Sequence, residues 1–188
     1  MEQLRISEVI QKLYHTRSLV SELDAPSSPG LYACFVRNPS VLRPLQPGPN
    51  GLIYVGKAEN LAKREFANHF NDRGTGSSTL RRSLGAILKQ RLGLTALPRG
   101  SGRTAQDFSC YRFDPVGEAR LTAWMREQLE VAVYAVANPA EIENHLIKSM
   151  KPLLNLIGWD NPDRPELKKL RKACADEARG HSAEIVPV

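Results

Sequence analysis

Two spacings of hydrophobic residues alternate along the chain. Where apolar residues recur every three or four positions, one side of a helix is apolar, and this spacing predicts helices at residues 6–20, 61–70, 80–92, 120–128, 139–150 and 166–178. Short runs rich in β-branched and aromatic residues predict strands at 31–36, 52–55, 109–113 and 129–136. Segments rich in proline, glycine and serine predict loops at 25–30, 37–51, 74–79 and 93–107. The pattern predicts a small α/β (α+β) protein, with the first two strands paired as a hairpin and the 93–107 loop mobile.

Residues with polar side chains mark where several of these helices begin. Asn60 and Thr79 precede or open two apolar stripes, and short polar side chains at such positions accept a backbone N–H of the first turn. Asn138, Pro139 and Glu141 form the spacing of a capping box with proline in the first helical position. We therefore expect well-defined helix starts at these three places.

The helix predicted at 139–150 carries a carboxylate inside its apolar stripe. At about 100° per residue, Glu143 lies beside the arc formed by Ile142, Leu146 and Met150. An ionised carboxylate in a buried stripe is unfavourable unless a base or a metal ion compensates its charge. Two interpretations stay open, an ion pair with an arginine and a ligand for a divalent cation.

Composition adds a constraint on the partner. The 188 residues include 26 Lys and Arg against 20 Asp and Glu, a net charge of +6. Residues 57–112 alone hold eleven bases and four acids, or +7, which favours a polyanion such as nucleic acid. An ordinary solvated basic surface is the alternative.

Cysteine content and hydropathy limit the class of protein. The three cysteines, without CxxC spacing, favour reduced thiols over a disulfide framework or a structural zinc site. The N-terminal segment is charged throughout, and no stretch reaches the roughly 20 apolar residues of a membrane span. We expect a cytoplasmic protein that does not enter a membrane.

Three motifs, taken in order, resemble one family. Gly30-Leu31-Tyr32 is followed by YVGKAENLAKR at 54–64 and by ENHLIKSMKPLLN at 143–155. This succession resembles the signature of the GIY-YIG nuclease superfamily. The second motif is similar to that of the N-terminal nuclease domain of the bacterial excinuclease of nucleotide-excision repair. The resemblance also extends to restriction and homing endonucleases of this superfamily.

The resemblance implies a fold and a set of site residues. The expected fold is a small central antiparallel β-sheet flanked by helices. Tyr32 and Tyr54 would line the active site, Arg64 would face the scissile phosphate, Glu143 would bind Mg²⁺ (or Mn²⁺), and Lys57 would be a supporting base. The residues expected to support this site are Gly30, Gly56, Asn60, His69 and Asn155.

The chemistry of phosphodiester hydrolysis fits these residue types. The reaction needs a cation at the phosphate, a positive donor for transition-state charge and a base for water. Glu143 with its metal and the fork-shaped guanidinium of Arg64 meet the first two needs. A tyrosine is a poor base at its ordinary pKa near 10, so a phenolate would need the metal, Lys57 or Arg64 beside it. We favour Tyr32 as the base, with Tyr54 in support.

Two features depart from the family pattern. Tyr32 and Tyr54 are separated by 22 residues with a proline-rich insertion. Several relatives have a histidine four residues after the arginine, whereas here that position is Asn68 and His69 follows it. His69 falls in the apolar arc of its helix, which is more typical of a core histidine. The basic insertions at 72–128 are assigned to substrate contact, through Arg73, Arg81, Arg82 and Lys89.

These observations lead to one main hypothesis. A nuclease-like domain would span 27–157, preceded by a helical extension at 1–26 and followed by a charged, partly helical tail at 158–188. Its function would be divalent-metal-dependent endonuclease cleavage of DNA, with strandedness, RNA cleavage and oligomeric state left open. A catalytically inactive nucleic-acid-binding module of the same fold, and a small-molecule or structural α/β protein, are the alternatives.

Overall fold

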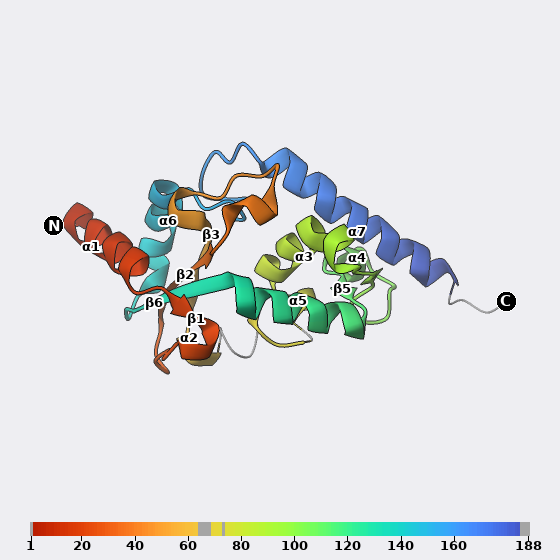
Figure 1. Ribbon diagram of the computed structural model, residues 1–188, viewed down its shortest axis with the longest axis horizontal. Helices are drawn as coiled ribbons and strands as arrows, with labels where there is room; N and C mark the ends of the chain where they lie inside the picture. Colours follow the sequence, from red (N-terminus) through yellow and green to blue (C-terminus); the bar gives the residue numbers. More distant parts are fainter. Residues whose placement is uncertain (1, 64–68, 73, 185–188) are drawn as a thin grey trace. The chain divides into compact units, whose positions relative to one another are not determined.

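Contacts between residues divide the chain into two compact units (Figure 1). The computed structural model describes residues 2–63, 69–72 and 74–184. We call Met1–Ala67 with Met125–Asp163 the sheet unit, and Asn68–Trp124 with Arg164–Val188 the insert unit. The expected boundaries were a domain at 27–157 and a tail at 158–188. By contacts, the C-terminal segment from Arg164 instead groups with the residues inserted after the second motif.

A four-stranded antiparallel sheet organises the sheet unit. Its strands are β1 (Ser18–Leu19), β2 (Gly30–Val36), β3 (Leu52–Ala58) and β6 (Leu129–Ala135), in the order β1-β6-β2-β3. The predicted hairpin is therefore formed by β2 and β3. All seven residues of β2 are buried, as expected for a strand with neighbours on both sides. The α/β fold with a small antiparallel sheet is confirmed.

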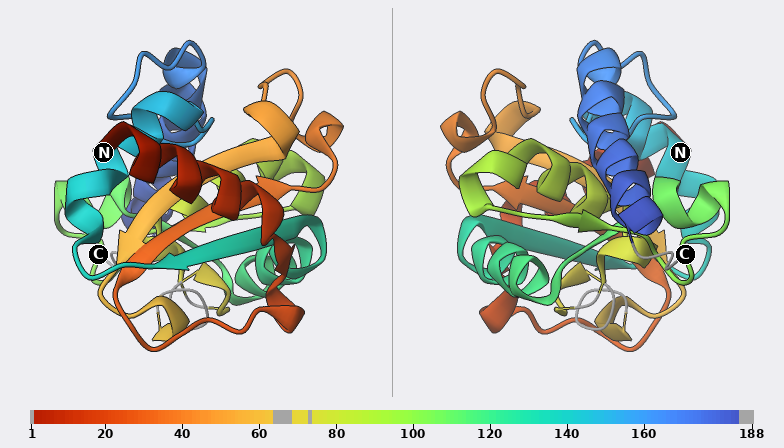
Figure 2. Two further views of the ribbon diagram at one scale, coloured as in Figure 1. Left: turned by 90° about the vertical axis from the view of Figure 1, so that its left-hand side faces the viewer. Right: turned by 90° about the vertical axis from the view of Figure 1, so that its right-hand side faces the viewer.

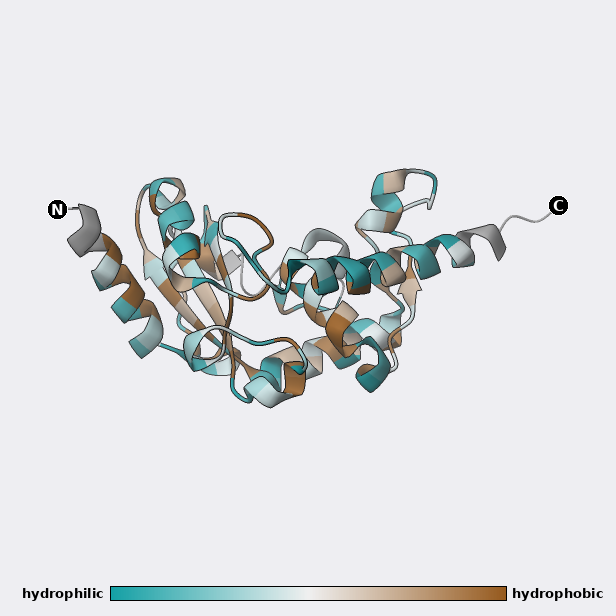
Figure 3. Ribbon diagram, turned by 90° about the horizontal axis from the view of Figure 1, so that it is seen from above, coloured by the Kyte–Doolittle hydropathy of each residue, from teal (hydrophilic) through white to brown (hydrophobic). Residues whose placement is uncertain are grey.

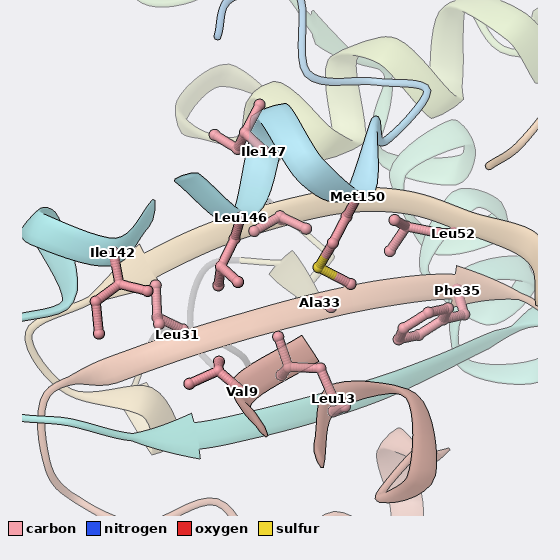
Figure 4. Packing of buried hydrophobic residues seen from close by; sticks show 12 residues of the cluster. Val9, Leu13, Leu31, Ala33, Phe35, Leu52, Ile142, Leu146, Ile147 and Met150 are labelled. Atoms are coloured by element: carbon pink, nitrogen blue, oxygen red, sulfur yellow. The ribbon is translucent and has the colours of Figure 1, made fainter. Parts of the chain in front are cut away.

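Two helices pack on one face of this sheet. They are α1 (Glu2–His15) and α6 (Pro139–Met150), and Figure 2 (left) shows α1 lying across the strands. Val9 and Leu13 of α1 meet Leu31 and Phe35 of β2, and the buried side of α6 completes the same apolar cluster (Figure 4). The face of α6 predicted from its spacing is thus the one that is buried.

The first helix ends earlier than its hydrophobic spacing predicts. The spacing extends to residue 20, but α1 stops at His15 because Ser18–Leu19 leave the helix and pair with β6 as β1. Val20 begins a short 3-10 turn, η1 (Val20–Glu22), and its side chain is buried. Pairing with the sheet overrides helical continuation here.

The proline-rich connection between β2 and β3 is a folded loop. It contains the 3-10 turns η2 (Pro39–Leu42) and η3 (Pro49–Gly51), and Leu42 and Leu45 are buried. The side chain of Asn38 accepts the N–H of Ser40 and caps η2. After β3, the sheet unit continues into α2 (Leu61–Lys63), where the predicted helix at 61–70 leaves the described residues.

The insert unit contains more regular structure than predicted. Its elements before the C-terminal helix are η5 (Thr75–Ser77), α3 (Thr79–Leu92), β4 (Ala96–Leu97), α4 (Ala105–Ser109) and β5 (Arg112–Phe113), and α5 (Pro115–Gln128) begins in it. The predicted loop at 93–107 contains the short strand β4 and the first residues of α4. β4 pairs with β5, and Thr104 and Asp107 form a capping box that starts α4.

A long C-terminal helix belongs to the insert unit. The helix α7 (Arg164–Glu184) contacts α3, α4 and β4, and buries Leu167, Cys174 and Ala178. Figure 3 shows mostly hydrophilic residues along α7 with a few apolar ones between them. This sparse apolar side explains why the sequence indicated a surface tail. In the part of the chain that the structure describes, no helix has the length and apolar character needed to cross a membrane.

The predicted helix starts differ from the observed ones either in the residue that caps the helix or in the hydrogen bond that it makes. Ser78, not Thr79, is the N-cap of α3, because its hydroxyl accepts the N–H of Arg81. Asn138 is the N-cap of α6 with Pro139 in the first turn, as predicted, but its side chain makes no capping hydrogen bond. The predicted capping box with Glu141 is therefore absent.

Candidate active site

The two signature tyrosines lie together on the β2–β3 hairpin. The antiparallel register pairs Tyr32 with Gly56 and Cys34 with Tyr54, and the two tyrosine rings are 6.0 Å apart between centroids. Tyr32 is fully buried, whereas Tyr54 is half-buried. The sequence separates these rings by 22 residues, and strand pairing brings them into contact.

Two glycines of the motifs are required by close packing. A β-carbon at Gly56 would lie 2.5 Å from the hydroxyl oxygen of Tyr32, so only glycine lets that ring cross β3. A β-carbon at Gly30 would lie 2.4 Å from the carbonyl oxygen of Tyr134 on β6. These supporting residues act through the space that they leave to their neighbours.

Glu143 forms an ion pair with the lysine of the second motif. The Nζ atom of Lys57 on β3 lies 3.0 Å from a carboxylate oxygen of Glu143 on α6. The side chains are 44% and 20% exposed, so both remain in contact with solvent. The position of a carboxylate at the edge of the apolar stripe is thus explained by a basic partner, which is lysine rather than arginine.

The tyrosine pair and this ion pair belong to opposite faces of the hairpin. Lys57 is opposite Leu31, whose side chain packs with α6, while Tyr32 covers Gly56. Successive residues of a strand point to opposite faces, so Gly56 and Lys57 present the two groups on either side of β3. The structure therefore groups four of the predicted catalytic residues into two pairs, Tyr32 with Tyr54 on one face of β3 and Lys57 with Glu143 on the other.

Asn155 holds the second motif in place. Its side-chain oxygen accepts the N–H of Val55, and its amide nitrogen donates to the carbonyl of Val55, both at 2.9 Å. The N–H of Leu154 also donates to the carbonyl of Ile53, so the segment after α6 is bound to the backbone of β3 at two places. Because both amide atoms bind backbone, the geometry gives Asn155 a positioning contact to the strand that carries Tyr54 and Lys57.

The structure describes only some of the other predicted site residues that follow β3. Arg64 and Asn68 lie outside the described residues, and so does Arg73. Asn60 is half-buried directly before α2. His69 belongs to the insert unit, where it is fully buried with Nδ1 2.8 Å from the hydroxyl of Ser78. This environment is that of a core histidine.

Arg81 lies in the interior of the insert unit. Its guanidinium donates from Nη2 to a carboxylate oxygen of Glu118 at 2.6 Å and from Nε to the hydroxyl of Thr75. Its Nη1 donates to the hydroxyl of Thr122 and the carbonyl of His69, and Nη2 also donates to the carbonyl of Glu118. All five N–H groups of the guanidinium can be used in this way. Arg81 is therefore not available to bind a phosphate, contrary to the prediction.

The other predicted phosphate contacts on α3 are also engaged within the unit. Arg82 is 8% exposed and donates from Nη1 to the carbonyls of Thr75 and Gly76. Lys89 forms an ion pair with Glu177 at 3.1 Å. Direct phosphate binding by Arg82 is accordingly withdrawn as well, since burial removes it from the surface.

A sequence signal for the burial of Arg81 existed. Gly85 and Leu88 follow it by four and seven residues, which places all three on one side of α3. A β-carbon at Gly85 would lie 2.1 Å from the ring of Phe113, so this side of the helix is closely packed. The prediction considered the charge of Arg81 and not its place on this side of the helix.

The side chains at this site fit one mode of binding a divalent cation and not another. Among the described residues, no group of three or more His, Cys, Asp or Glu side chains is placed to hold a metal ion. Mg²⁺ is commonly bound through one or two carboxylates, with water and substrate phosphate completing its oxygen ligands. A single solvent-accessible carboxylate such as Glu143 fits that mode, and it does not fit a closed site built from protein ligands alone.

Comparison with known proteins identifies the family. No curated protein and no solved structure matches the chain. A family model described as the GIY-YIG catalytic domain matches residues 41–173, which is well over half of the chain. The matched segment includes Tyr54, Lys57, Arg64, Glu143 and Asn155, and it begins after Tyr32. The order of motifs and the antiparallel sheet agree with this match, and the chain belongs to the GIY-YIG family.

Proposed function

We propose that this protein is a divalent-metal-dependent endonuclease that hydrolyses phosphodiester bonds in DNA. Membership of a family of nuclease-type domains supports a nucleic acid as substrate. The observation that carries the proposal is the partly exposed pair of Lys57 and Glu143, 3.0 Å apart on two matched motifs. A carboxylate and an ammonium group side by side at a solvent-accessible position are suited to a cation and a phosphate, respectively.

Glu143 is the residue proposed to hold the metal ion. A bound divalent cation would supply charge neutralisation at the phosphate and the leaving oxygen. Among the described residues, Glu143 is the carboxylate proposed for it, so water and phosphate oxygens would complete its ligands. Cation and substrate should consequently bind more tightly together than either does alone.

Lys57 is proposed to change partner when substrate binds. In the free protein its ammonium group compensates the charge of Glu143. With a cation bound at Glu143, Lys57 would no longer be needed for that compensation and would be repelled by the like charge, so it would turn toward a phosphate oxygen. Its ammonium group then stabilises negative charge that develops during hydrolysis.

Tyr54 is proposed to position water and Arg64 to bind the phosphate. Both tyrosines lie on the face of β3 opposite Lys57 and Glu143, so their proposed part does not run through a metal ion at Glu143. Tyr54 keeps partial contact with solvent while Tyr32 is fully buried against Gly56. This difference favours Tyr54 over Tyr32 as the group that meets water, the reverse of the preference drawn from sequence. Tyr32 would then fix the orientation of the Tyr54 ring, 6.0 Å away.

Cleavage assays with a matched pair of variants test the proposal. Purified protein is incubated with Mg²⁺ or Mn²⁺ and duplex, single-stranded, flap and junction DNA, with RNA in parallel. Glu143→Gln is expected to abolish detectable cleavage, while Glu141→Gln, an exposed carboxylate two residues earlier on α6, should cleave like the wild type. Full activity of Glu143→Gln overturns the site assignment. Binding of DNA by the wild type without cleavage would instead support an inactive module of the same fold.

A further inference from the structure

Two arginines of the insert unit converge on one backbone oxygen. The Nη1 atoms of Arg82 on α3 and Arg99, which follows β4, donate to the carbonyl of Gly76 at 2.9 and 3.2 Å. Arg82 is buried, and its Nε has no hydrogen-bond partner among the described residues. Arg99 is exposed. Two positive charges are thus held close together, one inside the unit and one at its surface.

The C-terminal helix brings a third arginine near Arg82. Arg171 on α7 is half-buried, and α7 packs against both α3 and β4. Burial is the main cause that lowers the pKa of Arg82. Cys110 and Tyr111 oppose this shift, while the positive charges of Arg171 and Arg99 add to it. Arg82 is therefore within electrostatic reach of both Arg99 and Arg171, which come from segments far apart in the sequence.

These three arginines lack an acidic partner of their own. In the described residues, neither Arg82 nor Arg99 nor Arg171 forms an ion pair, whereas the neighbouring Arg81 and Lys89 each have a glutamate. The carboxylate of Asp107 does feel the charge of Arg99. That carboxylate, however, already accepts the backbone N–H groups of Arg103 and Thr104 at the start of α4. Among the described residues, then, no acidic side chain holds Arg82, Arg99 or Arg171 in an ion pair.

We propose that Arg99 and Arg171, backed by the buried Arg82, form a binding site for a backbone phosphate of nucleic acid. The proposal rests on the proposed function for its substrate and assigns the substrate contact to residues that sequence reasoning did not select. Guanidinium groups bind phosphate oxygens through paired N–H donors and remain charged at all relevant pH values. The buried charge of Arg82 attracts the phosphate without touching it. Arg99 and Arg171 have the exposure needed to contact the phosphate.

The size of the effect follows from counterion release. Each phosphate contact that is lost lowers the slope of log K against log salt by about 0.9 for duplex DNA. The corresponding loss of affinity is about five- to tenfold per contact at 0.1 M salt, and it is independent of sequence. Because both arginines are proposed to contact one phosphate, each single variant should lower the slope in part and the double variant by about one unit in all.

DNA binding in EDTA separates this site from catalysis. A fluorescent duplex and a single strand are titrated at several salt concentrations with wild type, Arg99→Gln, Arg171→Gln and the double variant. Lys172→Gln is the matched control, because Lys172 neighbours Arg171 on α7 but pairs with Asp176. The two single variants and the double variant should show the stepwise fall in slope, and the control should keep the wild-type slope. Thermal unfolding confirms that each variant is folded.

The outcomes distinguish the site from the proposed function. An unchanged salt slope in the folded double variant overturns the phosphate site, even when the wild type cleaves DNA normally. A wild type that binds DNA with the expected slope but cleaves nothing with Mg²⁺ or Mn²⁺ overturns the nuclease function and leaves the phosphate site standing. A wild type that binds no nucleic acid overturns both.

Discussion

Two glutamate–base pairs in this molecule have the same chemistry and opposite surroundings. In the insert unit, Arg81 and Glu118 are 2.6 Å apart with side chains 0% and 4% exposed. In the sheet unit, Lys57 and Glu143 are 3.0 Å apart and substantially exposed. The buried pair has additional hydrogen bonds from Thr75 and from the N–H of Phe113 to the Glu118 carboxylate.

The difference between the pairs indicates which one can take part in a reaction. A buried ion pair with every donor satisfied is strongly held, because removing one partner leaves an uncompensated charge. A solvent-accessible pair gains about 1 kcal/mol or less and exchanges partners easily. Arg81 and Glu118 therefore belong to the framework, and Lys57 and Glu143 can release each other for a cation and a phosphate.

The largest effect is expected from opening the buried pair. Arg81→Met keeps most of the side-chain volume and leaves the Glu118 carboxylate unpaired in the interior. The free energy of unfolding should fall by about 3–5 kcal/mol, measured by urea denaturation. Lys169→Met, which breaks the exposed pair with Glu166 on α7, is the control and should change it by about 1 kcal/mol or less. Equal effects of the two variants would remove the distinction between buried and exposed pairs.

The second effect is on catalysis and should leave stability almost unchanged. Glu143→Gln retains the shape of the side chain and removes the charge proposed to hold the metal. We expect cleavage to slow by at least about 10²–10³-fold, equivalent to about 2.7–4 kcal/mol, while the free energy of unfolding changes by about 1 kcal/mol or less. Single-turnover cleavage and urea denaturation of the same preparation check both parts. A loss of stability as large as that of Arg81→Met would make Glu143 a framework residue.

A third prediction concerns the support beneath the exposed pair. Asn155→Ala removes both hydrogen bonds to the backbone of Val55, which are buried. Leaving these groups unpaired should lower the free energy of unfolding by about 1–3 kcal/mol and speed amide hydrogen exchange within β3. Asn161→Ala, which removes side-chain contacts to the carbonyls of Leu153 and Asn155 instead, is the comparison for local specificity. Unchanged exchange in β3 of the Asn155 variant would argue against a positioning role.

The smallest effect is the coupling within the exposed pair itself. A double-mutant cycle with Lys57→Met and Glu143→Gln should give about 0.2–1 kcal/mol of interaction free energy. Salt screens charges that are in contact with solvent, so this coupling should decline between low and high ionic strength in urea denaturation experiments. A coupling that is much larger and independent of salt would place this pair in the same class as Arg81 and Glu118.

Much of the sheet unit was predictable because its information is local. The runs at 31–36, 52–55 and 129–136 are strands in the structure, and the apolar side of α6 is the one expected from a period of 3.6 residues. Glu143 was singled out by its place at the edge of that side. The catalytic roles of Tyr32, Tyr54, Arg64 and Glu143 stay predictions.

The insert unit was predicted less well because its charges act across distant segments. Arg81 was selected for its charge, yet Glu118, 37 residues further along the chain, determines its place in the interior. The C-terminal helix shows few apolar residues, and only its packing on α3 and β4 makes it part of a core. A basic stretch by itself does not reveal which of its side chains will find an acidic partner.

The sequence by itself determined the family, the antiparallel hairpin and the two motifs that carry Lys57 and Glu143, because these follow from spacing along single segments. Only the tertiary structure decided that Lys57 is the partner of Glu143, that the tyrosines occupy the other face of β3, and that Arg81 is buried. The physical reason is that the free energy of a charge depends on its solvent exposure and on the partners that folding brings to it.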